Sequence, residues 1–485
     1  MLEVGDNLKI VTVDTTIYDV KNFTFTDSSI NIEGKRNKND QETDFNGELE
    51  FGEIAYMQSQ EAKVFQTLVF ATLTSAIIIS GTLNSWGDEG ITPTIKFQSG
   101  GSCPYVYSWN GDKYILEGEA FGTALGKGLE TETCITLPKL KPFDNKLKIK
   151  LTNERPETHF FNTISLVAAE VDKDVTVYSD NKNILQTLVK SKKINGASDL
   201  NDNDLRTQLL NEDNLYWESD LSSANNDHDF EDQLFIDLKD VGDVDSISLV
   251  VAAINTEISS SVFKYLYMLL GDEFANFTRA AETDDELITI LKETLTRSAL
   301  KFDIWDGEKW KYTNQIYPEA NFVKFNKLVR LPIMLHDGQM RIRLRCLTDV
   351  WKIDALHFDD SIPRKIKTHK AEILSFQSNT LGNIDDIKTK DDRYIKLLPG
   401  EEIVLEFNEI EPLENKKIVY STNVGGYLYE WIIDESIVVG EGLEGLDTST
   451  PKMKIVKSMM KNMDTFLPII YEDWRISKHK IASNN

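Results

Sequence analysis

The chain has 485 residues, 41% of them hydrophobic and 10% aromatic, which is enough for roughly three folded domains with their own cores. It carries 79 acidic against 53 basic residues and a formal net charge of -26, which argues against nucleic acid as a partner, because binding to phosphates needs a basic face. Three cysteines are too few for a disulfide scaffold and too dispersed for a four-ligand zinc site, and the one disulfide that we consider is Cys103 with Cys134.

Residues 1–62 alternate between apolar and polar side chains with the period of two that is typical of β-strands. Ile10, Phe23 and Ile32 lie on the apolar side of this pattern. The polar segment 35–44 is expected to be a loop between strands. The whole pattern predicts a small antiparallel β-barrel of the SH3-like kind.

A run without any charged residue follows, from Val64 to Leu83. Its length is roughly the 20 residues that an α-helix needs to cross a bilayer, and its Ser and Thr hydroxyls can bond back to the helix backbone. We therefore expect residues 63–84 to be a transmembrane helix that serves as an uncleaved signal anchor, unless a leader lies upstream, and residues 85–102 to be a linker. Because Val, Ile and Thr also favour strands, a buried segment between domains is one alternative, and a segment on the membrane surface is another.

Two similar aromatic hairpins are predicted in the body of the chain. The segment Trp109-Asn110-Gly111-Asp112-Lys113-Tyr114 is repeated almost residue for residue as Trp305-Asp306-Gly307-Glu308-Lys309-Trp310. A third turn of this kind is expected within 336–339. Asn-Gly and Asp-Gly pairs favour the two-residue type I′ turn, which needs positive φ at both central positions. The residues expected to form the three turns are Asn110, Gly111, Asp306, Gly307, Asp337 and Gly338.

The repeated hairpins favour two β-sandwich domains over one large sheet. We expect the first sandwich over residues 103–257 and a second, jelly-roll-like one over residues 299–362. A third β segment, 363–435, is expected either as a separate part or as the piece that completes the sandwiches. Residues 436–485 are expected to be an irregular tail. The predicted fold class is therefore mainly β.

One helical signal and one strand signal stand out in the body. Residues 258–298 are predicted to be a helical insertion, because Thr283 and Glu286 have the spacing of a capping box at the start of a helix. Further on, apolar side chains alternate with arginines, so the apolar side of this strand is expected to lie in the core. The alternating residues are Met340, Arg341, Ile342, Arg343, Leu344, Arg345 and Cys346.

The arginine stripe is the most promising ligand-binding candidate, because it is a local basic face on an acidic protein. The planar guanidinium group suits recognition of carboxylates and sugar acids. Tryptophans in neighbouring strands would complete a surface for a glycan or a protein partner. The alternative is a ladder of arginines paired with Asp and Glu of the adjacent strands. The residues of this candidate surface are Arg341, Arg343, Arg345, Trp305, Trp310 and Trp351.

Metal and cofactor signals are weak. The acidic segment 225–232 could hold calcium through Asp227, Asp229 and Asp232, but it lacks the ordered positions and the glycine of an EF-hand loop. The glycine-rich segment 122–128 is one residue short of a phosphate-binding loop and lacks its hydroxyl, so a structural loop is expected. No other metal site and no cofactor are expected.

Catalytic signals are equally weak, and no catalytic residue is assigned. The chain contains no His-Glu-x-x-His pair and no Gly-x-Ser-x-Gly elbow. Glu117 and Glu119, near Trp109, could imitate the paired carboxylates of a glycosidase, although a solvated strand face explains them as well.

The segment from Cys103 to Tyr114, with Glu117-Gly-Glu-Ala-Phe-Gly122 after it, resembles a family of uncharacterised bacterial envelope proteins, many of them predicted lipoproteins. Further matches, in the same order, extend over roughly residues 5 to 432; they include Leu151-Thr-Asn-Glu154, Trp351-Lys-Ile-Asp354 and Asp392-Arg-Tyr394. The resemblance implies an exported, envelope-associated β protein without an assigned activity. This chain departs from the family by lacking a leader with a lipidated cysteine, so its mode of anchoring stays open.

The function that these observations favour is that of a non-catalytic, membrane-anchored protein of the bacterial cell envelope with a binding or structural role. Its expected partners are the membrane and other envelope proteins or glycans. One alternative is a hydrolase that acts on polysaccharide with a carboxylate pair. Another is a subunit of a larger surface complex, in which the apolar run packs against other chains.

Overall fold

The computed structural model describes residues 8–12, 16–25, 29–38, 41–50, 53–59, 104–155, 157–219, 230–256, 273–319, 322–380, 382–430 and 449–462, together with Ile258, Leu266, Leu270, Leu467, Ile470 and Tyr471. The chain divides into two compact units. Unit 1 comprises Met1–Gly100, Glu257–Thr294 and Trp431–Asn485, and unit 2 comprises Gly101–Thr256 and Leu295–Glu430. Most described residues lie in β-strands, so the expected mainly β class is confirmed.

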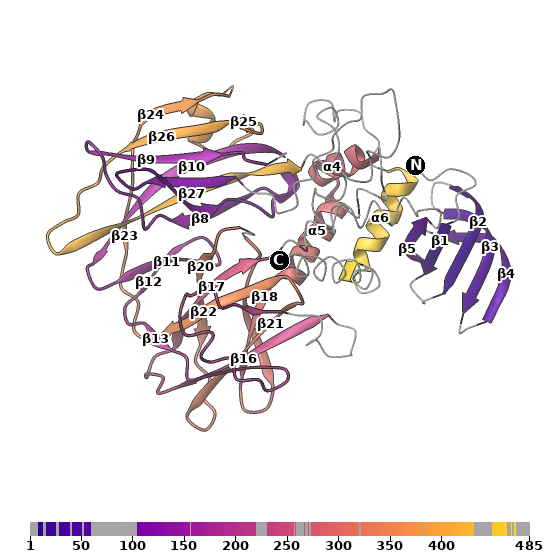
Figure 1. Ribbon diagram of the computed structural model, residues 1–485, viewed down its shortest axis with the longest axis horizontal. Helices are drawn as coiled ribbons and strands as arrows, with labels where there is room; N and C mark the ends of the chain where they lie inside the picture. The colour runs from indigo at the N-terminus through magenta and orange to yellow at the C-terminus, as the bar shows by residue number, and fades with distance from the viewer. Residues whose placement is uncertain are drawn as a thin grey trace, which may run out of the picture. The chain divides into compact units, whose positions relative to one another are not determined.

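Unit 1 contains an antiparallel five-stranded sheet in the order β4-β3-β2-β1-β5 (Figure 1). Its strands are β1 (Leu8–Thr12), β2 (Ile17–Phe25), β3 (Ser29–Lys38), β4 (Gln41–Glu50) and β5 (Ile54–Ser59). Ile10, Val20 and Ile30 are buried, as the alternation requires. Among the described strands no pairing joins β4 to β5, so the SH3-like barrel stays a prediction.

The expected loop over 35–44 is wrong. These residues belong to the long hairpin of β3 and β4, in which Lys35 lies opposite Asp44. The Lys35 Nζ and Asp44 Oδ1 atoms are 3.0 Å apart, and Asp44 raises the pKa of Lys35. Polar strand faces are common where a sheet meets water, so polarity alone did not identify a loop.

Three α-helices have described bounds, and all three begin in unit 1: α4 (Phe274–Thr283), α5 (Asp285–Ser298) and α6 (Pro451–Lys461). α4 and α5 lie within the expected helical insertion. The cap of α5 is Asp284, whose Oδ1 accepts a hydrogen bond from the backbone N–H of Leu287. The expectation of an irregular tail is wrong for α6, which begins with Thr450 as N-cap and Pro451 in the first turn.

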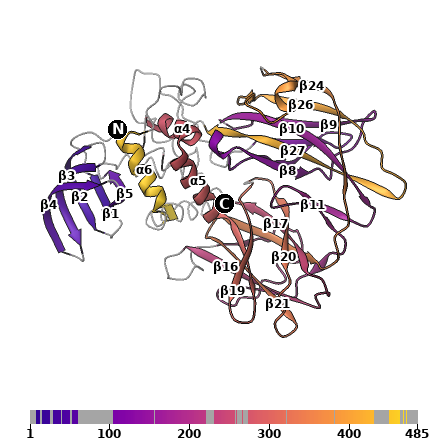
Figure 2. The ribbon, with the colours of Figure 1, turned by 180° about the vertical axis from the view of Figure 1, so that it is seen from behind.

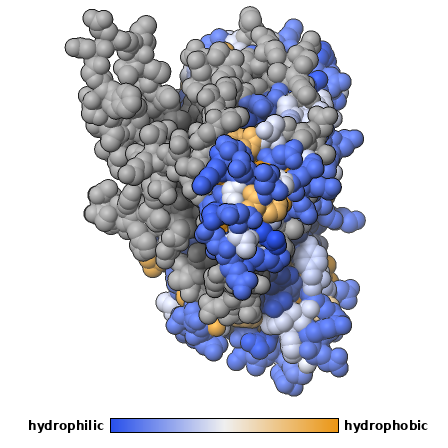
Figure 3. Space-filling view, turned by 90° about the vertical axis from the view of Figure 1, so that its right-hand side faces the viewer, coloured by the Kyte–Doolittle hydropathy of each residue, from blue (hydrophilic) through white to orange (hydrophobic). Residues whose placement is uncertain are grey.

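The apolar run 63–84 and the linker 85–102 lie outside the described residues. Among the helices that the structure does describe, none is both long enough and apolar enough to span a bilayer. One face of the molecule is shown in Figure 3, where the described surface is mostly hydrophilic with small apolar patches.

Unit 2 contains a first β-sandwich of two sheets that pack face to face (Figure 1). One sheet has the order β24-β26-β9-β6-β7 and the other β23-β10-β27-β8, with β25 also pairing with β10. Leu147, Phe161 and Leu405 are fully buried between them. The strands are β6 (Tyr105–Trp109), β7 (Tyr114–Glu119), β8 (Thr131–Thr136), β9 (Lys146–Thr152), β10 (Glu157–Asp172), β23 (Lys367–Lys370), β24 (Ile373–Ser378), β25 (Ile395–Leu397), β26 (Glu402–Asn408) and β27 (Lys416–Glu430).

The second sandwich of unit 2 also consists of two sheets (Figure 2). One has the order β12-β11-β20-β17-β22-β13, with β15 also pairing with β22, and the other has the order β14-β16-β21-β18-β19. The strands are β11 (Thr176–Asp180), β12 (Leu185–Leu188), β13 (Lys192–Lys193), β14 (Gly196–Asp199), β15 (Trp217–Glu218), β16 (Glu231–Lys239), β17 (Ser246–Asn255), β18 (Leu300–Trp305), β19 (Trp310–Ile316), β20 (Phe325–Pro332), β21 (Gln339–Leu347) and β22 (Trp351–Asp359).

The sheets combine segments that lie far apart in the sequence. The segment 363–435 supplies β23 to β27 to the two sheets of the first sandwich. Strands β11 to β17, which we expected within the first sandwich, belong instead to the second. Each sandwich is therefore completed by strands from the other half of unit 2.

The two aromatic hairpins are present, but their turns differ from the expected type. Asn110 is outside the positive-φ region, whereas Gly111 has φ 98°, and the loop contains the four residues between Trp109 and Tyr114. The Asn110 Oδ1 atom accepts hydrogen bonds from the N–H groups of Asp112 and Lys113, which makes an Asx turn more favourable than a type I′ turn.

The second hairpin repeats this geometry with Asp306 and Gly307, the latter at φ 100°. The third turn does have two central residues with positive φ, Asp337 at 52° and Gly338 at 74°. His336 and Gln339 exchange backbone hydrogen bonds across it, as expected for a two-residue turn.

Candidate binding surface

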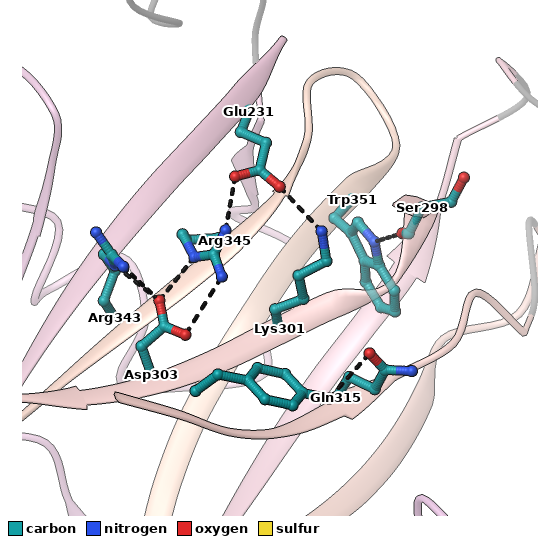
Figure 4. Close-up of polar contacts among 9 residues, drawn as sticks. Glu231, Ser298, Lys301, Asp303, Gln315, Arg343, Arg345 and Trp351 are labelled. Atoms are coloured by element: carbon teal, nitrogen blue, oxygen red, sulfur yellow. Dashed lines mark hydrogen bonds and ion pairs between the residues drawn. The ribbon is translucent and has the colours of Figure 1, made fainter. Parts of the chain in front are cut away.

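The arginine stripe lies on β21, on the side of the sheet that faces away from the core, and acidic residues of β16 and β18 are paired with it (Figure 4). Arg341 Nε donates to Asp237 Oδ1 at 3.0 Å. Arg343 donates to Asp303 through Nε at 2.9 Å and Nη2 at 2.6 Å. The structure thus has the arginine ladder paired with acids of the adjacent strands, which was the alternative interpretation.

Asp303 is at the centre of this network and is only 1% exposed. It also accepts from Arg345 Nε at 2.6 Å, so one buried carboxylate serves two guanidinium groups. Burial lowers the pKa of Arg345, but the hydrogen bonds and charges of Asp303 and Glu231 together outweigh it and the pKa is raised. Burial likewise raises the pKa of Glu231, but hydrogen bonds and charges of Lys301 and Arg345 outweigh it and lower the pKa.

Aromatic rings flank the arginines on the same face. The guanidinium carbon of Arg343 lies 4.8 Å from the centre of the Trp310 ring, a cation–π contact. The Trp305 and Trp310 ring centres are 5.4 Å apart in an edge-on contact, and Phe235 lies 5.8 Å from Trp310. Tyr312, two residues along β19, is 56% exposed.

Trp351 does not belong to this surface. It lies on β22, in the opposite sheet, and is fully buried. Its indole N–H donates to the carbonyl oxygen of Ser298 at 2.8 Å (Figure 4). We therefore define the arginine face as Arg341, Arg343, Arg345, Trp305, Trp310 and Tyr312, and assign Trp351 to the core.

A second surface, with lysines in place of arginines beside acids and aromatic rings, lies on the first sandwich. It was not identified from the sequence as a candidate site. Lys148 and Lys146 both pair with Glu406, at 2.8 and 2.9 Å, and their hydrogen bonds lower the Glu406 pKa to about 2. Lys150 Nζ lies 5.0 Å from the centre of the Tyr114 ring. The alternation of lysines with Leu147, Ile149 and Leu151 was visible in the sequence and could have identified this surface.

The aromatic part of this second surface also matches the first. Trp109 and Tyr114 ring centres are 5.2 Å apart in an edge-on contact, and Phe143, 6.5 Å from Trp109, is 46% exposed. We define the lysine face as Lys146, Lys148, Lys150, Trp109, Tyr114 and Phe143.

Glu117 and Glu119, the possible carboxylate pair, are both engaged in holding the fold. Glu117 accepts hydrogen bonds from Ser108 Oγ at 2.7 Å and from the Lys139 N–H at 2.8 Å, and burial raises its pKa. Glu119 is buried and accepts from the N–H groups of Phe322 and Val323. Both carboxylates therefore accept hydrogen bonds within the fold.

The calcium candidates Asp227 and Asp229 lie outside the described residues, as does Cys103. Asp232 is fully buried, and its Oδ1 accepts from the Gln233 N–H at 2.7 Å. Within the described part of the chain, no group of three or more His, Cys, Asp or Glu side chains could hold a metal ion. Cys134 is buried, and burial raises its pKa to about 11.

A buried histidine of the first sandwich has an unusual environment. His159 Nε2 lies 2.7 Å from Glu157 Oε2, and both residues are almost completely buried. The ring centres of Phe121 and Phe161 lie 6.4 and 6.2 Å from that of the imidazole, both in T-shaped arrangements. Burial lowers the His159 pKa to about 3, so at neutral pH the ring is uncharged, and its Nε2 shares a hydrogen bond with the Glu157 carboxyl group.

No protein-family model matches the chain, and no curated protein sequence matches it. Among solved structures, the chain is similar to a GH31 alpha-xylosidase from Xanthomonas citri, with 8% identity and a TM-score of 0.15 over 88% of this chain. The chain spans 38% of the length of that structure. A TM-score this low carries no argument about fold or activity.

The first prediction concerns Asp303. Asp303→Asn leaves the partly buried guanidinium group of Arg343 without its counter-charge and Arg345 with Glu231 as its remaining acidic partner, so we expect a loss of about 2 to 4 kcal/mol in the free energy of unfolding. Asp237→Asn is the matched control and should cost less than about 1 kcal/mol, because the side chains of Arg341 and Asp237 are 50% and 38% exposed. Urea unfolding measures both, and equal losses would contradict a central role for Asp303.

The second prediction concerns the buried His159. The unfolded chain binds a proton at this residue below pH 6.5, whereas the folded chain does so only near pH 3, so folding stability falls as the pH decreases between these values. Compared with His159→Gln, the wild type should lose about 3 kcal/mol more between pH 7 and pH 4. Urea unfolding at several pH values measures this difference, and parallel pH profiles of the two proteins would disprove it.

Proposed function

We propose that unit 2 is a non-catalytic binding module that binds polysaccharide on the arginine face and on the lysine face. The observation that carries this proposal is the recurrence of one arrangement on both sandwiches. In each, a cation lies over a ring, at 4.8 Å for Arg343 and Trp310 and at 5.0 Å for Lys150 and Tyr114. An aromatic side chain beside it remains open to solvent.

The charges of the faces indicate which ligand fits. On the arginine face, Asp303, Asp237 and Glu231 already accept the hydrogen bonds of the arginines. The cations are therefore largely neutralised, and a strongly anionic polymer gains little there. A hydroxyl-rich sugar ring suits such a surface, because its apolar side packs on an aromatic ring while its hydroxyls bond to fixed guanidinium and carboxylate groups.

The cellular setting is part of the same proposal. The resemblance to bacterial envelope proteins and the charge-free run Val64 to Leu83 support a protein that is anchored in the membrane of the cell envelope. In this proposal the small sheet of residues 8–59 forms an SH3-like barrel, and unit 2 contacts glycans of the envelope. No arrangement among the described residues favours the hydrolase alternative, since Glu117 and Glu119 are both used in the fold.

The third prediction tests the binding surface in the full chain. Tyr312→Ala removes an exposed ring, so affinity for the polysaccharide that the wild type binds should fall about tenfold or more, as for hot-spot aromatics. Phe143→Ala should have a similar effect through the lysine face. Ile184→Ala, at an equally exposed apolar residue between β11 and β12, in the sheet opposite the one that carries the arginine face, is the control.

Affinity electrophoresis in a panel of neutral and carboxylated polysaccharides measures this binding, with circular dichroism to verify folding. Binding that neither aromatic substitution weakens, or an absence of binding across the panel, would contradict the proposal.

The fourth prediction tests the anchor. The full chain should sediment with membranes, and a version without residues 64–83 should remain in the supernatant after ultracentrifugation, because it has lost the apolar run. Extraction with carbonate separates an inserted chain from a chain that is bound only to the surface. If the full chain also remains in the supernatant, the anchoring proposal is wrong.

A further inference from the structure

The two sandwiches of unit 2 share the order of ten strands, and the second sandwich has two additional strands, β11 and β12, beside β20. The sheet β7-β6-β9-β26-β24 of the first corresponds to β19-β18-β21-β16-β14 of the second. The sheet β23-β10-β27-β8 corresponds to β13-β22-β17-β20, and the short β25 pairs with β10 as β15 pairs with β22. Ten described strands of one sandwich therefore have ten counterparts in the other.

The order of these counterparts along the chain is not the order of the sandwiches. Strands β6 to β10 correspond to β18 to β22, and strands β23 to β27 correspond to β13 to β17. The chain therefore runs through the same ten strands twice in the same order, once over 105–255 and once over 300–430, which we name repeat 1 and repeat 2. Each sandwich contains the first five strands of one repeat and the last five of the other. The hairpin of β11 and β12, which follows β10 in repeat 1 and has no counterpart in repeat 2, adds two strands to the second sandwich.

We infer that unit 2 consists of two tandem ten-stranded repeats that exchange their C-terminal halves. Each five-stranded half is then an interaction surface, and its partner is the complementary half of the other repeat. This is the intrachain form of the exchange that produces domain-swapped dimers.

The pairing registers support the equivalence residue by residue. The β6–β7 pairing has its irregularity between Val106 and Tyr107, and the β18–β19 pairing has its irregularity at the corresponding place, between Phe302 and Asp303. Trp109 lies two residues after Tyr107, and Trp305 lies two residues after Asp303. The two tryptophans are therefore equivalent when the bulges are aligned, as the repeated hairpin motif requires.

The central strands carry a second shared bulge. In β10 the register shifts around Asn162, and in β22 it shifts around Asp354. Both bulge residues are buried, and both accept a hydrogen bond from a loop N–H, Asn162 from Asp391 at 3.0 Å and Asp354 from Asp213 at 3.2 Å. A buried polar bulge with the same partner is a specific feature that two unrelated sandwiches would not share.

The same register extends to the strands that follow these loops. Four residues after Asp391, Ile395 of β25 pairs with Phe161. Four residues after Asp213, Trp217 of β15 pairs with Ile353. Both pairs lie directly beside the bulge, so the equivalence covers the exchanged halves as well as the hairpins.

The links between the halves give a physical reason for the exchange. After β10, the chain turns within 173–175, where the Val175 N–H bonds to the Asp172 carbonyl, and crosses to the second sandwich through the additional hairpin of β11 and β12, which precedes β13. After β22, residues 360–366 lead directly into β23 of the first. Short hinge links of this kind favour swapping, because they do not let the chain fold back on its own first half.

The fifth prediction tests the exchange in the full chain with pairs of cysteines in a Cys103→Ser background. Lys148 lies opposite Glu406 on β9 and β26, and Arg341 lies opposite Asp237 on β21 and β16. Side chains opposite each other on one face have Cβ atoms about 5 Å apart, within reach of a short thiol crosslinker. Lys148→Cys with Glu406→Cys, and Arg341→Cys with Asp237→Cys, should therefore become linked within one chain in most molecules.

The matched control uses the same positions in the other combination. If each repeat closed on itself, Lys148 would lie opposite Asp237 and Arg341 opposite Glu406, so those two double variants would become linked instead. Mass spectrometry of the linked peptides identifies the pairs, and a denaturing gel separates links within a chain from links between chains. Linking of the control pairs, or linking of Lys148→Cys with Glu406→Cys only between two chains, would overturn the inference.

Discussion

The backbone pairing of β27 with β10 is the interaction on which unit 2 depends. It extends from Glu157 opposite Glu430 to Asp172 opposite Lys416, and it places β27, the last strand of unit 2, between β10 and β8 in a sheet of the first sandwich. In the second sandwich the pairing of β17 with β22 has the same role. Because buried N–H and C=O groups must be satisfied, neither central strand can leave its sheet without exposing an entire ladder of unpaired groups on its neighbours.

The same sheets explain why both outer faces combine cations, acids and aromatic rings. An arginine or lysine stripe needs acids on the adjacent strands, and Asp303 and Glu406 supply them. The acids hold the cations in place over Trp310 and Tyr114, which leaves a polar but nearly neutral surface with rigid geometry. Rigid, neutral and partly aromatic surfaces suit uncharged polar ligands better than they suit polyanions.

The sequence predicted the faces of strands well and their partners poorly. Alternation correctly placed Ile342 and Leu344 in the core, because period two reports only which side of a strand is apolar. It does not report that Ile149 pairs with Leu405 rather than with the equally suitable Ile236. The arginine stripe was found for the same reason, and acidic partners on the adjacent strands were foreseen as an alternative. Which acids they are was not predicted, since that depends on which strands are neighbours. The turn type was wrong because the Asn110 side chain binds the loop itself.

The long sequence separation of paired strands also matters while the protein is being made. Asp172 pairs with Lys416, so the partner of β10 leaves the ribosome roughly 250 residues, or on the order of 10 to 50 seconds, after β10 itself. During that time the apolar side of the nascent β10, with Phe161 and Leu166, has no completed sheet to pack in. A chaperone that shields this half until translation ends would therefore raise the yield of folded protein.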